Sequence, residues 1–313
     1  MQPLIVLTGP TAAGKTALSL KLAQSTGGEI ISADSVQVYR GMDIGSAKIR
    51  PEEMHGVRHH LIDILDPDEA FDVVRFRDLA KEAVGGIAAR GNLPVVAGGT
   101  GFYIQALLKD VAFEEEDETD DLRRQLEERS AAGETQALYE ELCTCDPDAA
   151  RAIHPHNTRR VIRALEFYRR NGYPISQHNA KAAKQTSPYR YCYFVLTQDR
   201  GALYERINRR VDQMMEDGLL QEVSGLREAG YGPELPSMKA IGYRELNAYL
   251  DGQYDLETAV TLIKRNTRHF AKRQLTWFRR ERDVILLERE AFRDEAQILD
   301  EMLRVCRERK IIL

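Results

Sequence analysis

Residues 9–16 have the sequence GPTAAGKT and match the phosphate-binding pattern G-x-x-x-x-G-K-[ST] in full. In this pattern, small residues let backbone N–H groups curl around a polyphosphate, and the start of the following helix favours the anion. The lysine neutralises the terminal phosphate, while the threonine hydroxyl holds Mg²⁺. The sequence therefore predicts a site for a diphosphate or triphosphate, with Mg²⁺ as cofactor, formed by Gly9, Thr11, Ala12, Ala13, Gly14, Lys15 and Thr16.

A second polar segment, DSVQVYR at 34–40, follows an apolar run. In an open parallel sheet the loops after the strands line one crevice, so we expect Asp34 to face the phosphate loop. Its carboxylate suits three roles, namely a general base, a metal ligand or the N-cap of a helix. The spacing alone does not choose among them.

The apolar run that ends in Gly98-Gly99-Thr100-Gly101 lacks the acid that many phosphate-loop NTPases carry at this point. Its tip offers backbone amides and one hydroxyl, and a tight turn between a strand and a helix is the alternative interpretation. Asp63 or Asp66 could still supply a metal-binding acid, so nucleotide hydrolysis stays open.

Basic side chains recur at helical spacing in two later segments. Arg206 and Arg210 are four residues apart and suit a phosphate clamp, although such arginines are often solvated surface. Lys264, Arg268 and Lys272 share one helical face without intercalated acids, a pattern that suits either nucleic-acid contact or a solvated face.

Charge is distributed unevenly along the chain. The 313 residues carry a net charge of −5, which disfavours a protein that coats nucleic acid by bulk charge. Yet Arg151–Arg170 holds six arginines against Glu166 alone, and Lys264–Arg282 holds eight basic residues against Glu281 alone. Local basic surfaces on an acidic protein indicate one defined anionic partner.

Composition sets further bounds. A chain that is 43% hydrophobic and 30% charged is typical of a folded protein and excludes wholesale disorder. No uncharged stretch suits a membrane span, and the N-terminus lacks the form of a signal peptide. Four cysteines do not make a disulfide framework, and Cys143 and Cys145 lack the second pair that a zinc site needs. We therefore expect a cytoplasmic protein without a membrane partner.

The elements that must position these residues alternate in type over the first 113 residues. Short apolar runs that end in turns predict strands at 4–7, 29–33, 60–65 and 94–97. Helices are expected from about 15 to the glycines at 27–28, at 71–90, and from the glycine turn at 98–101 through 108. This alternation is the sequence form of an α/β fold with a parallel sheet.

The pattern changes at 114, where seven acids occur in the eight residues 114–121 and no strand is expected before 188. A strand returns at 191–196, followed by helices near 203–213, 237–250 and 256–280, a strand at 284–287 and a C-terminal helix. The sequence thus predicts a P-loop NTPase-like α/β core at 1–113 and 189–313, with basic C-terminal helices and a helical insertion at 114–188.

These segments resemble the tRNA dimethylallyltransferase (tRNA isopentenyltransferase) family in its bacterial form. The matching pieces occur in one order and cover most of the chain: GPTAAGKT (9–16), DSVQVYRGMDIGSAK (34–48), HHLIDI (59–64), VAGGTGFYIQALL (96–108), HNTRRVIRALE (156–166), AIGYREL (240–246) and NTRHFAKRQLTWFRR (266–280). The second piece is very specific, because a generic phosphate-loop kinase does not need it. Ala13 stands where many members have serine, which leaves the backbone amides unchanged.

The resemblance implies transfer of a dimethylallyl group from dimethylallyl diphosphate to N6 of the adenosine 3′ to the anticodon in tRNA, with release of diphosphate. It implies Asp34 as the general base, whereas Lys15, Thr100 and Arg206 act on the diphosphate together with Mg²⁺ on Thr16. The implied tRNA contacts are Asp34, Ser35, Val36, Gln37, Arg159, Arg160, Arg163, Lys264, Arg268, Lys272 and Arg273. We expect a monomer that grips the tRNA anticodon arm and takes the adenosine out of its stack, as in base flipping.

Three other functions fit part of the sequence. A small-molecule kinase or ATPase would use the same loop on ATP. An adenylate isopentenyltransferase would prenylate free AMP, ADP or ATP, but it has no need of the basic insertion or the basic C-terminal stripe. An RNA-binding P-loop switch protein would not need Asp34.

Overall fold

The structure is a computed structural model that describes residues 1–110 and 121–313, without the side chains of 182–184. It divides into two compact units. Unit 1 joins Met1–Asp110 to Pro188–Leu313, and unit 2 spans Val111–Ser187. The expected insertion, 114–188, differs from unit 2 by three residues at its start and one at its end. Most of the acidic run, 114–120, lies outside the described residues.

Unit 1 is built on a sheet with the strand order β3-β2-β4-β1-β5-β6. Its strands are β1 (Gln2–Thr8), β2 (Gly28–Ala33), β3 (His59–His60), β4 (Leu93–Gly98), β5 (Tyr189–Thr197) and β6 (Val284–Glu288). The pairings between these strands are parallel, and Leu7 of β1 lies between Ala97 of β4 and Phe194 of β5. The predicted parallel α/β core is confirmed, and segments far apart in sequence meet at its centre.

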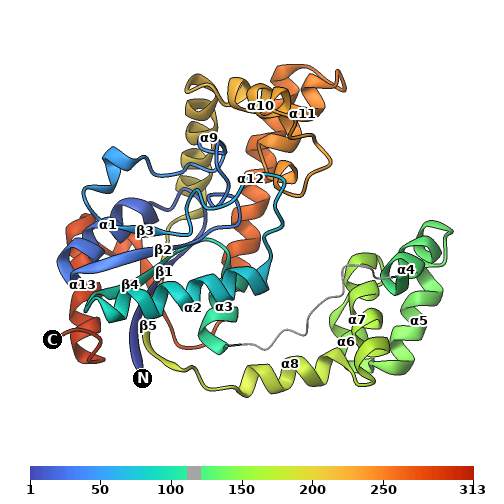
Figure 1. The fold of residues 1–313 in the computed structure, drawn as a ribbon, viewed down its shortest axis with the longest axis horizontal. Helices are drawn as coiled ribbons and strands as arrows, with labels where there is room; N and C mark the ends of the chain where they lie inside the picture. The colour runs from blue at the N-terminus through green and yellow to red at the C-terminus, as the bar shows by residue number, and fades with distance from the viewer. Residues whose placement is uncertain (111–120) are drawn as a thin grey trace. The chain divides into compact units, whose positions relative to one another are not determined.

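Helices cover both faces of this sheet (Figure 1). They are α1 (Lys15–Thr26) and α13 (Glu295–Glu308) on one face, and α2 (Val73–Ala89) and α3 (Gly101–Lys109) on the other. Ile5 and Leu7 point into the first core, whereas Leu4 and Val6 point into the second. Because both faces are buried, the strands consist of continuous apolar runs rather than alternating patterns.

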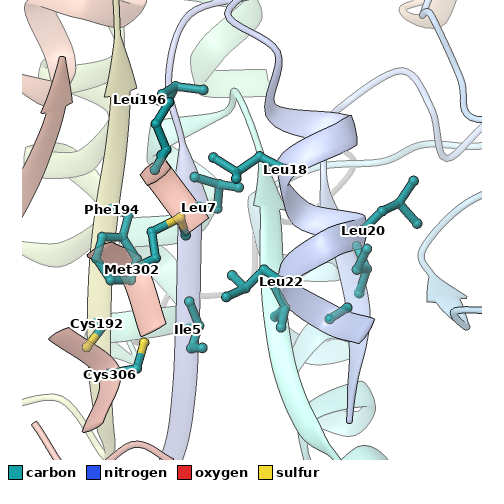
Figure 2. Packing of buried hydrophobic residues seen from close by; sticks show 14 of the residues in the cluster. Ile5, Leu7, Leu18, Leu20, Leu22, Cys192, Phe194, Leu196, Met302 and Cys306 are labelled. Carbon is teal, nitrogen blue, oxygen red and sulfur yellow. The ribbon is translucent and has the colours of Figure 1, made fainter. Parts of the chain in front are cut away.

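Leucines of α1 fill the first of these cores (Figure 2). Leu18 and Leu22 are fully buried and lie four residues apart, so they project from one face of the helix. Met302 of α13 and Phe194 of β5 are buried in the same cluster. Burying one leucine stabilises a fold by about 1.5–3 kcal/mol. This packing fixes α1 against the sheet, and with it the loop that leads into α1.

The strand expected at 60–65 is wrong in extent, because β3 ends at His60. Leu61 and Asp63 have φ values of 63° and 54°, which lie outside the region that strands adopt. The Asp63 N–H instead donates to the carbonyl of Gln37 at 3.2 Å. This segment therefore supports the loop after β2 rather than extending the sheet.

The helix expected at 237–250 is also wrong, because two elements occupy that segment. They are the 3₁₀ helix η2 (Ser237–Lys239) and α11 (Tyr243–Leu250). Gly242 separates them with a φ of 96°, a conformation that glycine adopts without strain. The helical pattern was present, but the glycine interrupts it.

The C-terminal helices of unit 1 form a core of their own. They are α9 (Arg200–Glu216), α10 (Leu219–Glu228), α11 and α12 (Leu256–Phe278). α10 was not expected, although its buried Leu219, Val223 and Leu226 have the spacing of a helix face. Val38 and Tyr39, from the loop after β2, join this core and tie the loop to the helices. None of the helices in the described part of the chain is long and apolar enough to cross a membrane.

Unit 2 is helical in its described part. Its helices are α4 (Asp121–Ala131), α5 (Thr135–Cys145), α6 (Pro147–Ala152), α7 (Thr158–Asn171) and α8 (Ile175–Lys184). Leu126, Leu142 and Leu165 are buried together with apolar residues of α6. This unit therefore has its own hydrophobic core, separate from the sheet.

A buried carboxylate ties β2 to its neighbours in unit 1. Glu29, which is 5% exposed, accepts hydrogen bonds from Arg90 Nε (2.8 Å) and Nη2 (2.7 Å) and from Asn92 Nδ2 (2.8 Å). The Nε2 atom of His60 lies 2.7 Å from the same carboxylate. The bonds from Arg90 contribute most to lowering the pKa of Glu29 to about 2. Its charge therefore stabilises the fold above the ordinary pKa of 4.5, and that stability is lost as the pH falls toward 2.

We expect Glu29→Ala to lower the free energy of unfolding at pH 7 by about 2–3 kcal/mol, because Arg90 and Asn92 lose their partner. The Arg90 side chain is 39% exposed, so water compensates part of the loss. Urea unfolding should show the difference shrinking as the pH falls from 4.5 toward 2. The control is Glu52→Ala, in the exposed part of η1 (Pro51–Met54), which should leave the midpoint unchanged. Equal midpoints for Glu29→Ala and the wild type at pH 7 would contradict this role.

Candidate active site

The phosphate loop joins β1 to α1. Helix α1 begins at Lys15, and Gly14 precedes it with a φ of 93°. A Cβ at Gly9 would lie 2.3 Å from the carbonyl oxygen of Leu196, so only glycine lets the loop pack this closely against β5. The strand, loop and helix that the motif requires are therefore present. The predicted phosphate-binding residues, Gly9, Thr11, Ala12, Ala13, Gly14, Lys15 and Thr16, lie in this loop and the first turn of α1.

Lys15 turns back over the loop, and its Nζ donates a hydrogen bond to the carbonyl of Pro10 at 2.8 Å. Its pKa is lowered to about 8, chiefly by burial and then by the charge of Arg210, while the charge of Asp34 opposes the shift. A cation whose charge is disfavoured in the free protein gains most from an anionic ligand. The electrostatics of Lys15 therefore suit a phosphate.

Two cavities lie beside the loop. The smaller, about 110 Å³, is lined by Lys15 and Thr16, and the larger encloses about 440 Å³. Asp34 and Arg210 are among the residues that line both, so the two cavities adjoin each other. The apolar wall of the larger cavity includes Tyr39, Phe71, Ile207, Val211, Met214, Leu219, Ile263 and Phe270. A charged compartment thus adjoins an apolar one.

Asp34 shapes its own loop and still faces both cavities. Its Oδ1 accepts the N–H groups of Val36 at 2.9 Å and Gln37 at 3.4 Å. Its Oδ2 receives no hydrogen bond from any described residue. The role of helix N-cap is wrong, because residues 35–50 form turns and irregular segments, and no helix begins before Pro51. The hydrogen bonds to Oδ1 shape the loop instead, and Oδ2 can accept a proton or bind a metal.

Thr16 is exposed at the start of α1 and lines the smaller cavity with Asp34. Within the described residues, no three histidine, cysteine, aspartate or glutamate side chains gather as metal ligands. Thr16 offers a hydroxyl oxygen in this cavity, and Mg²⁺ is commonly held by one or two protein oxygens together with phosphate oxygens and water. These residues fit a Mg²⁺ that binds together with a diphosphate.

Gln274 of α12 joins the two turns that face the phosphate site, and the sequence analysis missed it. Its Oε1 accepts the N–H of Thr11 at 2.9 Å, and its Nε2 donates to the carbonyl of Gly99 at 2.9 Å. A Cβ at Gly99 would lie 2.3 Å from that Nε2, so the glycine turn makes room for the amide. One feature of the sequence could have indicated Gln274. It is a polar residue on the apolar face of α12, four residues from both Phe270 and Phe278.

Thr100 follows this glycine turn and lines the larger cavity. Its N–H donates to the carbonyl of Ala33 at 3.2 Å, so the end of β4 lies beside the end of β2. Asp34 follows Ala33 directly. The turn and the aspartate, 66 residues apart in sequence, therefore face the same cavity.

The two acids considered for nucleotide hydrolysis lie elsewhere. Asp63 pairs with Lys48, and Asp66 pairs with Arg40 at 2.8 Å. Both carboxylates are about half exposed, and neither lines a cavity beside the phosphate loop. Their position does not support a role as metal-binding acids there.

Three arginines approach the loop. Arg210 lines both cavities, and burial lowers its pKa against the opposing charge of Asp34. Arg206 lies one turn earlier on α9, and its Nη2 would be 3.5 Å from a Cβ at Gly14. Neither guanidinium forms an ion pair or hydrogen bond with a described residue. Helical spacing singled out these two, whereas the third, Arg289, follows β6 and was missed.

Ser35, Val36 and Gln37 share the loop of Asp34 but differ in environment. Ser35 and Val36 line the larger cavity. The side chain of Gln37 lies in the smaller one, where its Oε1 accepts from Ser32 Oγ at 3.0 Å and its Nε2 donates to the carbonyl of Ser46 at 3.3 Å. Gln37 therefore braces the loop, and a tRNA contact by this segment stays a prediction.

Glu222 of α10, which the sequence analysis also missed, holds another wall of the larger cavity. Its carboxylate accepts the N–H groups of Asp43 (2.9 Å), Ile44 (2.7 Å) and Gly45 (3.1 Å). It also accepts the hydroxyl of the buried Tyr243 at 2.6 Å. Four donors on one carboxylate fix this turn, and Gly45 lines the cavity.

The basic stripe of α12 is only partly exposed. Lys264 pairs with Asp212 at 2.5 Å, and Arg268 donates to an asparagine of α9 at 2.6 Å. These two residues fasten α12 to α9. Lys272 and Arg273 are exposed, and Arg273 lines the larger cavity. The stripe is therefore not a uniformly free surface, and tRNA contact by it stays a prediction.

Helix α7 of unit 2 carries a second basic surface. Arg159, Arg160 and Arg163 are exposed and form no ion pair with any residue in 1–110 or 121–313. The opposite face buries Val161 and Leu165 in the core of the unit. The helix thus presents three arginines that are unpaired within the described residues, and arginine side chains commonly contact phosphates.

Comparison with known sequences identifies relatives along the whole chain. A model of the family described as IPP transferase matches residues 37–281. The chain is 55% identical over 312 residues to a tRNA dimethylallyltransferase of Lachnoclostridium phytofermentans, with 100% of both chains covered. It is 49% identical over 282 residues to a tRNA dimethylallyltransferase of Desulforudis audaxviator, with 90% of both covered.

Solved structures of tRNA-modifying transferases also match this chain. The tRNA isopentenylpyrophosphate transferase of Bacillus halodurans is 44% identical, with a TM-score of 0.74, and the match covers 99% of this chain and 98% of that one. A eukaryotic dimethylallyltransferase acting on tRNA is 32% identical, with a TM-score of 0.79, and the match covers 92% of this chain and 74% of that one. The expected resemblance is confirmed, and the chain belongs to the IPP transferase family, that of the tRNA dimethylallyltransferases.

Proposed function

We propose that this chain transfers the dimethylallyl group of dimethylallyl diphosphate to N6 of the adenosine 3′ to the anticodon in tRNA and releases diphosphate. The position of Asp34 carries this proposal. Its carboxylate lines both the compartment beside the phosphate loop and the apolar compartment, so it can face a diphosphate ester and an adenine together. We also propose that the chain acts as a monomer in the cytoplasm.

In this proposal the diphosphate lies on the loop amides beside Lys15, Arg206 and Arg210. When the bond between C1 and the diphosphate oxygen breaks, the electron pair goes to the oxygen, and these cations stabilise the developing charge. The adenine amine is a weak nucleophile, because its lone pair is delocalised into the ring. It forms the new N6–C1 bond as the old bond breaks, and its proton passes to Oδ2 of Asp34.

Mg²⁺ and Thr100 complete the proposed diphosphate site. Thr16 would hold the ion together with diphosphate oxygens, and the ion would supply positive charge to the departing group. Thr100 would add its hydroxyl from the turn after β4. The apolar wall of the larger cavity suits a five-carbon chain and the faces of an adenine that has left its stack.

Two alternatives are less well supported. For a kinase or ATPase, the sequence offered Asp63 or Asp66 as the metal-binding acid, but both are paired with basic residues outside both cavities. An adenylate isopentenyltransferase would have no use for the exposed arginines of α7 or for Lys272 and Arg273 of α12. Basic surfaces of this kind suit a phosphate backbone, and we propose that they bind the tRNA anticodon arm.

The function is tested by incubating the protein with dimethylallyl diphosphate, Mg²⁺ and an unmodified tRNA. We expect a prenyl-sized mass gain on the adenosine 3′ to the anticodon, located by mass spectrometry of nuclease fragments. Parallel reactions contain free adenylate in place of tRNA, or ATP alone. Prenylation of adenylate only, or ATP turnover without prenylation, would favour one of the alternatives instead.

The affinity for dimethylallyl diphosphate should fall as the pH rises above 8. In the free protein Lys15 loses its proton near pH 8, whereas the bound diphosphate raises the pKa and keeps the charge. Binding above pH 8 must therefore take up a proton, and the affinity decreases by up to about tenfold per pH unit. Calorimetry without tRNA measures this. In Lys15→Met the affinity should be lower and this pH dependence absent, and a flat wild-type profile from pH 7.5 to about 9.5 would count against Lys15 as a ligand.

Asp34→Asn should lower turnover by roughly 10²–10⁴-fold, the range for a lost general base. This substitution separates the two roles of Asp34. The amide oxygen can still accept hydrogen bonds from the N–H groups of Val36 and Gln37, while Oδ2 is replaced by an NH₂ group that cannot take a proton. Thermal stability and substrate affinities should change far less. A fully active Asp34→Asn enzyme would mean that another group takes the proton.

Arg160→Glu and Lys272→Glu should each weaken tRNA binding by about tenfold and reduce its salt dependence, because phosphate contacts release counterions. Diphosphate binding should be unchanged. Lys310→Glu, at an exposed position near the C-terminus, makes the same change in net charge and is the control. If Arg160→Glu and Lys272→Glu both bind tRNA as tightly as the Lys310→Glu control, the basic faces of α7 and α12 are only solvated surface.

A further inference from the structure

Arg289 approaches the phosphate loop from the segment after β6. It begins the 3₁₀ helix η3 (Arg289–Ala291), and its Nη1 donates to the carbonyl of Ala13 at 3.1 Å. A Cβ at Gly14 would lie 2.9 Å from this Nη1 and 3.5 Å from Nη2 of Arg206. Two guanidinium groups, 83 residues apart in sequence, thus cover the same glycine of the loop.

This arrangement concentrates positive charge with little acid to balance it. Glu295 lies 3.6 Å from Arg289, but it also pairs with Lys21 at 2.5 Å. Arg206 has no ion pair with a described residue, and its pKa is lowered by burial and then by the charge of Arg289. Like charges this close disfavour each other in the free protein, and an anion between them relieves the repulsion.

The segment that carries Arg289 is held in place by other contacts. The carboxylate of Glu290 accepts the N–H of Asp199, at the start of α9, at 2.6 Å. Leu287, two residues earlier, is buried in the core. A guanidinium has five N–H donors, and Arg289 uses one of them in a hydrogen bond to a described residue. Its other N–H groups form no hydrogen bond with a described residue.

We propose that Arg289 is a further diphosphate-binding residue. Together with Arg206, it contacts the diphosphate from the side of the phosphate loop on which Gly14 lies. The inference rests on the proposed function, because it takes the ligand of the loop to be a diphosphate. Arg289 lies beyond residue 281, where the match to the family model ends.

Calorimetric titration with inorganic diphosphate and Mg²⁺, without tRNA, tests the proposal. Arg289→Gln keeps a donor for the Ala13 carbonyl but removes the charge, whereas Arg289→Lys keeps the charge. We expect Arg289→Gln to weaken diphosphate binding about 10–100-fold, the effect of one charge-assisted hydrogen bond, and Arg289→Lys to weaken it less. Arg293→Gln removes the same charge from an exposed position nearby and should bind like the wild type.

Steady-state kinetics should show a higher KM for dimethylallyl diphosphate in Arg289→Gln, with a smaller change in kcat. If Arg289→Gln binds diphosphate as tightly as the wild type, or better than Arg289→Lys, then Arg289 only supports the loop and the proposal is overturned. Melting temperatures of each variant establish that it is folded. A wild-type protein that binds diphosphate but does not prenylate tRNA would overturn the proposed function and leave this inference standing.

Discussion

Partly buried positive charge around one loop is the constraint on which the site depends. Lys15, Arg206, Arg210 and Arg289 converge there from three distant parts of the chain, and Asp34 is the acid that faces two of them. Burial lowers the pKa of Lys15 and Arg210, so the free protein holds these charges at an electrostatic cost. An anionic ligand would offset that cost, because its charge favours the protonated forms of these side chains.

Polar bridges from α10 and α12 hold the walls of the two cavities. Gln274 connects the phosphate loop to the turn after β4, and Glu222 holds the turn at 43–45 through three backbone N–H groups. The net stabilisation from one such hydrogen bond is only about 0.5–1.5 kcal/mol. The larger effect is geometric, because each bridge fixes two segments relative to each other at the wall of a cavity.

The two carboxylate oxygens of Asp34 have different surroundings. One oxygen shapes the loop by accepting hydrogen bonds from two backbone N–H groups, and the other accepts none from a described residue. The basic surface of α7 has a different structural basis. Helix α7 belongs to a unit with its own core, so the arginines that we propose to bind tRNA do not depend on the packing around the sheet.

The sequence by itself determined the features that adjacent residues encode: the phosphate loop with its flanking strand and helix, the parallel α/β core, the position of Asp34 and the family. It failed where backbone turns interrupt a pattern, as at Leu61 and Gly242. Only the tertiary structure revealed the roles of Gln274 and Arg289, because their partners lie 263 and 276 residues away. Only the structure could separate Lys264, paired across α9, from the exposed Lys272, because a charge pattern does not record which cations already have partners.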